Sequence, residues 1–237
     1  MSNPELRLRR IDPLSYPDHA SLRPDDVCYC LGEYTAHRGN AFSPMNQIIG
    51  DLKIKPLNAS KEEIRSKDAA ISAVAEAFRN ALATGAECLN PKAATWVPIP
   101  PSAIRGDVLY DDRVLKLLST IEQGLGLDIR ELVKQYKNVQ PAHESELRPS
   151  VSEIAENYYI DDGLISPCPT GVWIFDDVLT GGNHYKAMQS VIQRRFPGVV
   201  TVGMFVARRV PEEAAQISWR EKMKTRAAVR PSLNQPD

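Results

Sequence analysis

Long apolar runs are missing from this sequence. None approaches the roughly 20 consecutive apolar residues of a membrane-spanning helix, and the amino terminus, MSNPELRLRR, has no apolar stretch after its charges. We therefore expect no secretory signal, no membrane partner and a cytoplasmic protein. A strong excess of one charge is missing as well, because the net charge is −1. The chain as a whole thus gives no indication that it binds nucleic acid.

Cysteine is scarce, and the four copies form no paired C-x-x-C units. Cys28 and Cys30 are separated by one residue, which on a strand places both thiols on one face, where reduced cysteines pack as small apolar side chains. A zinc site would need two more soft ligands, and His37 alone is a poor candidate. The pattern G-x-G-x-x-G is missing too, and Gly181-Gly182 does not supply it, which argues against a dinucleotide-binding oxidoreductase.

The composition is that of an ordinary globular protein, with 43% hydrophobic and 25% charged residues. The 237 residues suffice for one α/β domain with extensions or for two small domains. Short apolar runs alternate with amphipathic helical segments, so we expect an α/β fold with a doubly wound, largely parallel sheet. We place this domain at residues 26–210, after an extended N-terminal arm (1–25) and before a basic C-terminal helix and flexible tail (211–237).

Strands are predicted from short apolar runs, and helices from apolar residues that recur every three or four positions. Helix 60–82 has the clearest pattern, because Ser60 and Glu63 form a capping box ahead of an apolar stripe. The other expected helices cover 44–53, 110–123, 128–135 and 184–196, and the expected strands cover 27–31, 93–99, 158–160, 172–175 and 199–207. Residues 140–153 are polar and predict a long mobile loop, a length that is uncommon unless the loop is functional.

The stretch VWIFDDVLTGGNH, residues 172–184, is the most informative part of the sequence. Its apolar strand runs into Asp176 and Asp177, so both carboxylates should stand at the carboxyl end of a buried strand, where open α/β sheets bind ligands. A small loop then leads into a helix, whose first N–H groups favour anions. Paired acids beside an anion site suit a ligand with hydroxyls and phosphate, such as a ribose 5-phosphate. The plain alternative is a strand followed by an ordinary helix N-cap.

This stretch resembles the motif of the type I phosphoribosyltransferases that binds 5-phosphoribosyl 1-pyrophosphate (PRPP). In that family four apolar residues precede two acids, and a loop rich in Thr, Ser and Gly follows. The resemblance implies that Asp176 and Asp177 accept hydrogen bonds from the ribose 2′ and 3′ hydroxyls. It also implies that the 5-phosphate is wrapped by Thr180, Gly181, Gly182, Asn183 and His184. Gly181 and His184 depart from the family, which has Thr or Ser at the matching positions.

A second segment, WVPIPPSAIRGDVLYDDRVLKLL (96–118), adds further anion-binding chemistry. A strand that ends in Pro100-Pro101-Ser102 makes a constrained turn that can offer N–H groups and a hydroxyl to an anion. Arg105 and Arg113 can each bind phosphate oxygens through two hydrogen bonds. Asp111 and Asp112 can hold a metal ion directly or through water. The alternative for this acidic pair is a helix N-terminus where acids favour the helix dipole.

The same segment resembles the competence-associated ComF branch of the phosphoribosyltransferases. That branch has a Val-Pro-x-Pro strand end and then Arg-Gly before a helix, here 97–100 and Arg105-Gly106. Ile154 stands where that branch has an arginine, and the zinc-binding cysteines often found at its front are absent. The likeness extends loosely over about residues 28–210, through 32–34, 46–53, Gln140, Asn157 and Ala207-Arg208.

The resemblance also implies a reaction. Pyrophosphate would sit at Pro100, Pro101 and Ser102, loop 140–153 would close over the site, and Mg²⁺ would bridge pyrophosphate and ribose hydroxyls while Asp176 and Asp177 hold it indirectly. Arg105, Mg²⁺ and loop N–H groups would stabilise the departing pyrophosphate. A nucleobase is the expected acceptor.

Two alternative functions remain open from the sequence. One is a non-catalytic sensor of PRPP or a nucleotide, motivated by Gly181 and His184. Another is an effector subunit of a larger bacterial system, such as an antiviral defence complex. The basic residues near the C-terminus either contact nucleic acid or a protein partner, or form a solvated helix face.

Overall fold

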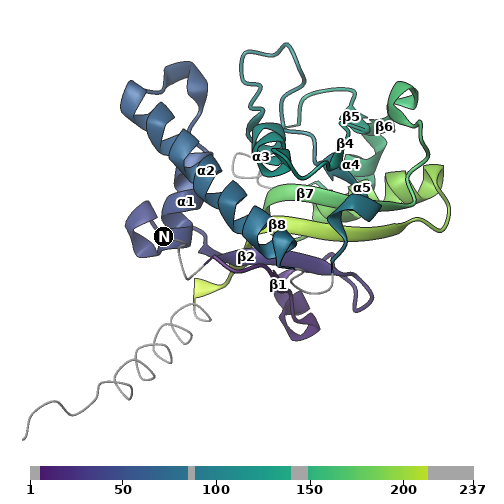
Figure 1. The fold of residues 1–237 in the computed structure, drawn as a ribbon, viewed down its shortest axis with the longest axis horizontal. Helices are drawn as coiled ribbons and strands as arrows, with labels where there is room; N and C mark the ends of the chain where they lie inside the picture. Colours follow the sequence, from purple (N-terminus) through teal and green to yellow (C-terminus); the bar gives the residue numbers. More distant parts are fainter. Residues whose placement is uncertain (1–5, 85–88, 140–148, 213–237) are drawn as a thin grey trace, which may run out of the picture.

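A computed structural model of the chain describes residues 6–84, 89–139 and 149–212. Its centre is a six-stranded sheet in the order β1-β2-β8-β7-β3-β4 (Figure 1). Only β1 and β2 pair antiparallel; the remaining neighbours are parallel. The strands are β1 (Arg9–Arg10), β2 (Cys28–Thr35), β3 (Thr95–Pro98), β4 (Asp128–Ile129), β7 (Gly171–Leu179) and β8 (Val200–Val210). The prediction of an α/β protein with a largely parallel sheet is therefore confirmed.

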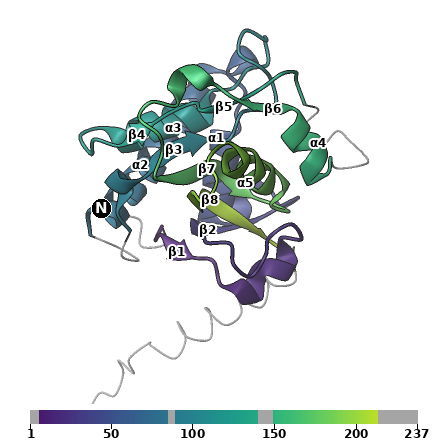
Figure 2. The same cartoon turned by 90° about the vertical axis from the view of Figure 1, so that its right-hand side faces the viewer.

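Helices cover both faces of this sheet (Figures 1 and 2). One face packs against α1 (Pro44–Leu52), α2 (Lys61–Ala83) and α3 (Arg113–Glu122), in a core that includes Trp96 and Phe175. The other face packs against α4 (Val151–Glu156) and α5 (Asn183–Arg195), in a core that includes Val97 and Ile174. Trp96 and Val97 are consecutive in β3, and so are Ile174 and Phe175 in β7, so each strand supplies both cores by simple alternation. This is the layering of a doubly wound fold.

Strands β3 and β7 lie side by side but lead to opposite faces. The chain after β3 enters α3 on the first face, and the chain after β7 enters α5 on the second. Open α/β sheets bind their ligands in the crevice at such a switch point. β3 pairs with β7 only as far as Phe175, whereas β8 pairs with it as far as Leu179. Asp176 and Asp177 therefore lie just beyond the last residue that β3 pairs with.

The long helix α2 begins as the sequence predicts. The Ser60 hydroxyl accepts from the Glu63 N–H at 3.2 Å, and the Glu63 carboxylate accepts from the Ser60 N–H at 2.8 Å. Helices α1, α3 and α5 agree with the predicted ranges to within three residues at each end, as boundaries of this kind commonly do. Strand β8 continues to Val210, beyond the predicted end at 207.

The predicted helix over 128–135 is wrong. Residues 128–129 form β4 at the sheet edge, and Val133–Gln135 forms β5, which pairs antiparallel with β6 (Tyr158–Ile160). Leu132 and Val133 are buried between these pieces. A segment this short has little helical stability of its own, so pairing with distant strands decides its conformation. Loop 140–153 also differs, because Val151 begins α4 behind a Ser150–Glu153 capping box.

The N-terminal segment is not the expected extended arm. Its described part forms β1 and the 3₁₀ helix η1 (Pro13–Asp18), and Leu8, Ile11, Tyr16 and Leu22 are buried against the domain. These contacts are made singly, without a helical or strand period, which is why the sequence gives no pattern there.

Several expectations fall outside the described residues. They concern Cys88, Gln140, most of the proposed closing loop (140–148) and the C-terminal helix and tail from 213 onward. Within the described ranges, no helix has the length and apolar character needed to cross a membrane.

Candidate functional site

Asp176 and Asp177 form the centre of the candidate site. Asp176 is partly exposed and Asp177 is buried, with 7% of its surface accessible. The Asp177 N–H donates to Asp176 Oδ1 at 2.8 Å, which holds the first carboxylate against the backbone of the second. Because both residues follow the end of the β3–β7 pairing, they stand at the crevice of the switch point.

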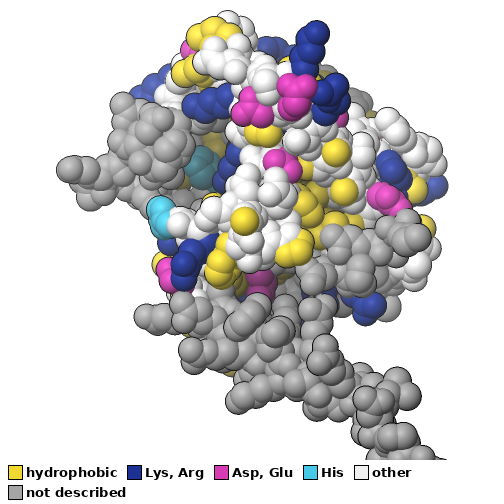
Figure 3. Space-filling model, turned by 90° about the vertical axis from the view of Figure 1, so that its left-hand side faces the viewer, with side chains coloured by type: hydrophobic (Ala, Val, Ile, Leu, Met, Phe, Trp, Pro, Cys, Tyr) yellow, Lys and Arg dark blue, Asp and Glu magenta, His cyan; other side chains and the backbone are white. Residues whose placement is uncertain are grey.

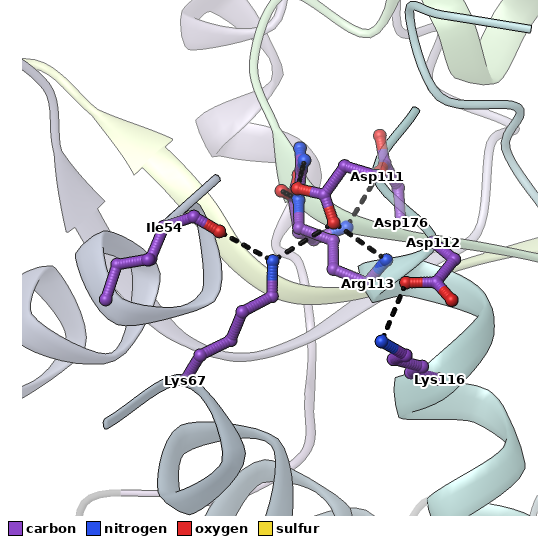
Figure 4. Close-up of polar contacts among 8 residues, drawn as sticks. Ile54, Lys67, Asp111, Asp112, Arg113, Lys116 and Asp176 are labelled. Atoms are coloured by element: carbon purple, nitrogen blue, oxygen red, sulfur yellow. Dashed lines mark hydrogen bonds and ion pairs between the residues drawn. The ribbon is translucent and has the colours of Figure 1, made fainter. Parts of the chain in front are cut away.

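Asp177 is held in a chain of buried charges, of which Figure 4 labels Lys67, Asp111 and Arg113. Arg113, at the start of α3, donates from Nε to Asp177 Oδ2 at 2.8 Å and from Nη1 to Asp111 Oδ2 at 2.8 Å. Lys67 of α2 donates to Asp111 Oδ1 at 3.0 Å and to the Ile54 carbonyl at 2.7 Å. The four charges balance, and three of the four side chains are at most 10% exposed while Arg113 is 25% exposed. Arg113, which was expected to bind phosphate, is paired with Asp177, one of the two acids expected to bind ribose.

This environment shifts the pKa values of the two acids in opposite directions. Burial raises the pKa of Asp176 well above its usual range, and the neighbouring Asp177 carboxylate raises it further. Burial also opposes ionisation of Asp177, but the charges of Arg113 and Lys53 outweigh it and lower the pKa of Asp177. The pair therefore divides into one carboxyl that holds a proton readily and one that stays ionised. Lys53 directly follows α1, in the segment 46–53 noted for its resemblance to the ComF branch.

The cradle loop, Thr180–His184, follows β7 and includes the first two residues of α5. Gly182 is the N-cap of α5 with φ of 87°, a left-handed conformation that favours glycine. As a glycine it has no side chain with which to cap the first N–H groups of the helix. These N–H groups and the exposed Thr180 are the anion donors that the loop offers.

The two polar side chains at the end of the cradle loop are held by neighbouring segments. His184 Nδ1 lies 2.9 Å from the hydroxyl of Tyr158, and burial lowers the pKa of His184, which favours neutral imidazole. Asn183 donates from Nδ2 to the Pro149 carbonyl at 2.9 Å. His184, expected to donate to phosphate, is thus placed against β6.

The predicted pyrophosphate turn borders a cavity of about 410 Å³. Pro100, Pro101 and Arg105 line it, whereas Ser102 lies in the same turn and accepts from the Val139 N–H through its carbonyl at 2.8 Å. Arg105 forms two hydrogen bonds to Glu131, at 2.9 and 2.7 Å, and also lies over the Tyr110 ring. Arg105 therefore lines the cavity while its guanidinium is paired with the Glu131 carboxylate.

Two aromatic rings also line this cavity. Tyr136 and Tyr159 are stacked, with ring centroids 4.6 Å apart and an angle of 28° between the planes. Asp111 and Asp112 also line the cavity, so it reaches the buried charge chain through Asp111, although Asp176 and Asp177 do not line it. An aromatic wall with a few polar groups is typical of a pocket for a flat organic ligand.

The expected magnesium ion was tested against the donors present. Carboxylate oxygens are the ligands that Mg²⁺ prefers, and Asp176 and Asp177 supply them. Among the described residues, however, no three His, Cys, Asp or Glu side chains gather closely enough to hold a metal ion. A metal ion here would have the carboxylates of Asp176 and Asp177 as protein donors and would take its other ligands from water or a bound molecule.

Some functional candidates were missed by sequence reasoning. Lys67 carried a signal, because it occupies a position on the apolar stripe of α2 between Ile64 and Ile71. In the structure only 5% of its surface is exposed. Tyr158 and the N-terminal residues His19 and Ser21, which contact the cradle loop, carried none. No protein-family model matches this chain, and no curated protein matches it.

Proposed function

We propose that this protein binds PRPP, or a nucleotide with the same ribose 5-phosphate, as a phosphoribosyltransferase of type I architecture. The observation that carries the proposal is the placement of Asp176 and Asp177 at the β3–β7 switch point, a few residues before a left-handed glycine and the N-terminus of α5. Ribose hydroxyls need acceptors, phosphate needs N–H donors, and the chain provides them in that order within a few residues.

Each part of the ligand then has a counterpart. Asp176 and Asp177 accept from the ribose hydroxyls, and the cradle loop binds the 5-phosphate. The turn 100–102 and Arg105 face the pyrophosphate, and the cavity lined by Tyr136 and Tyr159 accommodates an acceptor such as a nucleobase. Asp176 and Asp177 would hold Mg²⁺ indirectly, and the ion would neutralise the charge of the pyrophosphate.

Departure of pyrophosphate would leave positive charge on the ribose ring and negative charge on the leaving group. The Asp177 carboxylate, ionised because Arg113 lowers its pKa, is the acid that can stabilise the ring and its hydroxyls. Hydroxyls that donate to Asp177 would compete with Arg113, which would then be free to bind an oxygen of the ligand. Arg105 would stabilise the leaving group from the other side of the crevice.

A second candidate is a sensor that binds the ligand without turning it over. It is favoured by the contact of His184 with Tyr158 and by the salt bridge that already satisfies Asp177. A role as an effector subunit of a bacterial defence complex belongs to this second candidate. Positive and negative side chains are interspersed over the described part of the face in Figure 3. A nucleic-acid or protein partner is proposed at the basic C-terminal residues.

Calorimetric titration with PRPP, with and without Mg²⁺, tests the proposal. The double variant Asp176→Asn, Asp177→Asn should lose binding while the fold survives, because asparagine keeps the size and an acceptor for Arg113. Asp162→Asn, at a side chain that is 80% exposed, is the matched control. Equal affinity in the double variant and the wild type would exclude the assigned site. Pyrophosphate release with a panel of nucleobases separates the transferase from the sensor.

A further inference from the structure

A short N-terminal segment lies directly on the cradle loop. This segment, His19–Leu22, is called the strap here; it belongs to the purple part of the chain in Figure 2. The Nδ1 of His19 donates to the Thr180 carbonyl, and the Ser21 N–H donates to the Gly181 carbonyl at 2.9 Å. The Ser21 hydroxyl also donates to Asn183 Oδ1 at 2.7 Å.

These bonds determine where the N–H groups of the loop point. In a planar trans peptide the carbonyl and the following N–H point in opposite directions. Because the strap holds the Thr180 and Gly181 carbonyls, the N–H groups of Gly181 and Gly182 are directed away from the strap. An anion that approaches the loop from the side opposite the strap would therefore meet these two N–H groups.

The strap also restricts the most flexible residues of the site. Glycine has more backbone freedom than any other residue, and two glycines follow one another here. A Cβ placed on Gly182 would lie 3.3 Å from the Leu22 side chain, so the strap packs against the loop without a gap. His19 is fully buried, which fixes its ring between the strap and the loop.

The chain just after the strap is anchored to the same helix that follows the loop. Asp26 is 3% exposed and accepts from Lys186 Nζ of α5 at 2.8 and 2.9 Å and from Gln189 at 3.2 Å. The Tyr16 hydroxyl donates to the Asp26 carbonyl at 2.6 Å, which ties the chain ahead of the strap to the same point. Strap, loop and the first turns of α5 therefore form one connected unit.

We propose that His19 and Ser21 are positioning residues of the phosphate site, which orient the Gly181 and Gly182 N–H groups toward the phosphate of a sugar phosphate ligand. The inference rests on the proposed function, since it assumes that the cradle loop binds phosphate. Gly181 and His184 stand where the resembled family has hydroxyl side chains. The strap would give the loop the rigidity that such side chains do not provide here. A preformed loop binds its ligand more tightly because less order has to be created on binding.

Three variants test the strap. His19→Phe removes the donor and fills the same buried space, and it also removes the buried Nε2, which has no hydrogen-bond partner among the described residues. His19→Asn keeps a donor near the place of Nδ1. His37→Asn is the control, because His37 is exposed and its φ of 62° suits asparagine. Titration with ribose 5-phosphate measures binding, and ¹⁵N relaxation of the Gly181 and Gly182 amides measures loop order without a ligand.

We expect His19→Phe to weaken ribose 5-phosphate binding at least tenfold and to increase the mobility of both amides. His19→Asn should recover most of the affinity, and His37→Asn should match the wild type. If wild type and His19→Phe bind equally, the strap inference is overturned and the proposed function stands. If the wild type does not bind ribose 5-phosphate, the proposed function fails, and unchanged amide mobility in His19→Phe then overturns the strap as well. Should His19→Phe fail to fold, Ser21→Ala removes the hydroxyl bond to Asn183 while the Ser21 N–H bond to Gly181 remains. Weaker ribose 5-phosphate binding and more mobile amides in that variant support the strap, and no change in either overturns it.

Discussion

Arg113 donates a 2.8 Å hydrogen bond to the carboxylate of Asp177, so the second acid of the proposed ribose site is already paired with a cation in the free protein. The same guanidinium contacts Asp111, which in turn accepts from the buried Lys67. The Asp177 carboxylate therefore already has a hydrogen-bond donor in the free protein, and a ligand hydroxyl must compete with Arg113 for it. Two consequences can be measured, one for stability and one for pH dependence.

Arg113→Gln should destabilise the protein by about 3–5 kcal/mol, because it leaves the buried Asp177 carboxylate without its hydrogen-bonded cation and Asp111 with Lys67 alone. The free energy of unfolding in urea measures the effect. Lys116→Gln is the control, since the Lys116–Asp112 pair is largely exposed and should contribute less than about 1 kcal/mol. Similar losses in the two variants would show that the buried chain has no special role in stability.

Asp176 should make the stability fall as the pH rises. Its pKa is raised in the folded protein by burial and by Asp177, so between the ordinary value of 3.8 and the raised value the folded state holds a proton that the unfolded state has released. The stability that Asp176 contributes is therefore complete below about pH 4 and is lost as the pH rises through neutrality. Asp177 acts in the opposite sense, with a contribution that is lost only in acid.

Denaturation of wild type and Asp176→Asn across pH 4 to 8 measures this difference. Asparagine cannot titrate, so the variant should lose the decline that the wild type shows over this range. Parallel stability curves for the two proteins would contradict the raised pKa of Asp176.

Gly182→Ala should cost about 1–2 kcal/mol, because φ is 87° and a side chain is strained there. The added Cβ also approaches Leu22 at 3.3 Å, so a further loss is expected unless Leu22 shifts. Gly39→Ala should be close to neutral, since its φ is −58° and nothing lies within 4 Å of a Cβ there. Thermal unfolding compares the two, and a loss at Gly39 as large as that at Gly182 would refute the conformational explanation.

Gly181→Thr and His184→Thr restore the hydroxyls that the resembled family has in this loop. A gain in affinity for PRPP, or in pyrophosphate release, is expected if the cradle binds phosphate, because each hydroxyl adds a donor. His184→Thr also removes the contact with Tyr158, and the Gly181 Cβ would lie 3.3 Å from Asn183 Oδ1, so folding must be checked by thermal unfolding. Gains in neither variant would indicate that the phosphate does not lie against these positions.

The parts of the fold that repeat along the chain were predictable. The capping box of α2, its apolar stripe and the apolar strands around Trp96 and Ile174 follow from local periodicity and caps, and the structure has them. The helix expected at 128–135 failed because its residues obtain their hydrogen bonds from β3 and β6, which are distant in sequence. A local pattern cannot anticipate a partner that only folding brings near.

The same division applies to the site. The sequence alone determined that two acids follow a buried strand and precede a glycine loop and a helix, because residue type and order are sufficient for that. Tertiary structure decided that Arg113 covers Asp177, that His184 turns to Tyr158 and that His19 and Ser21 hold the cradle loop. These contacts join residues far apart in the chain. They are made by single side chains at one edge of the sheet, so they leave no repeating pattern in the sequence.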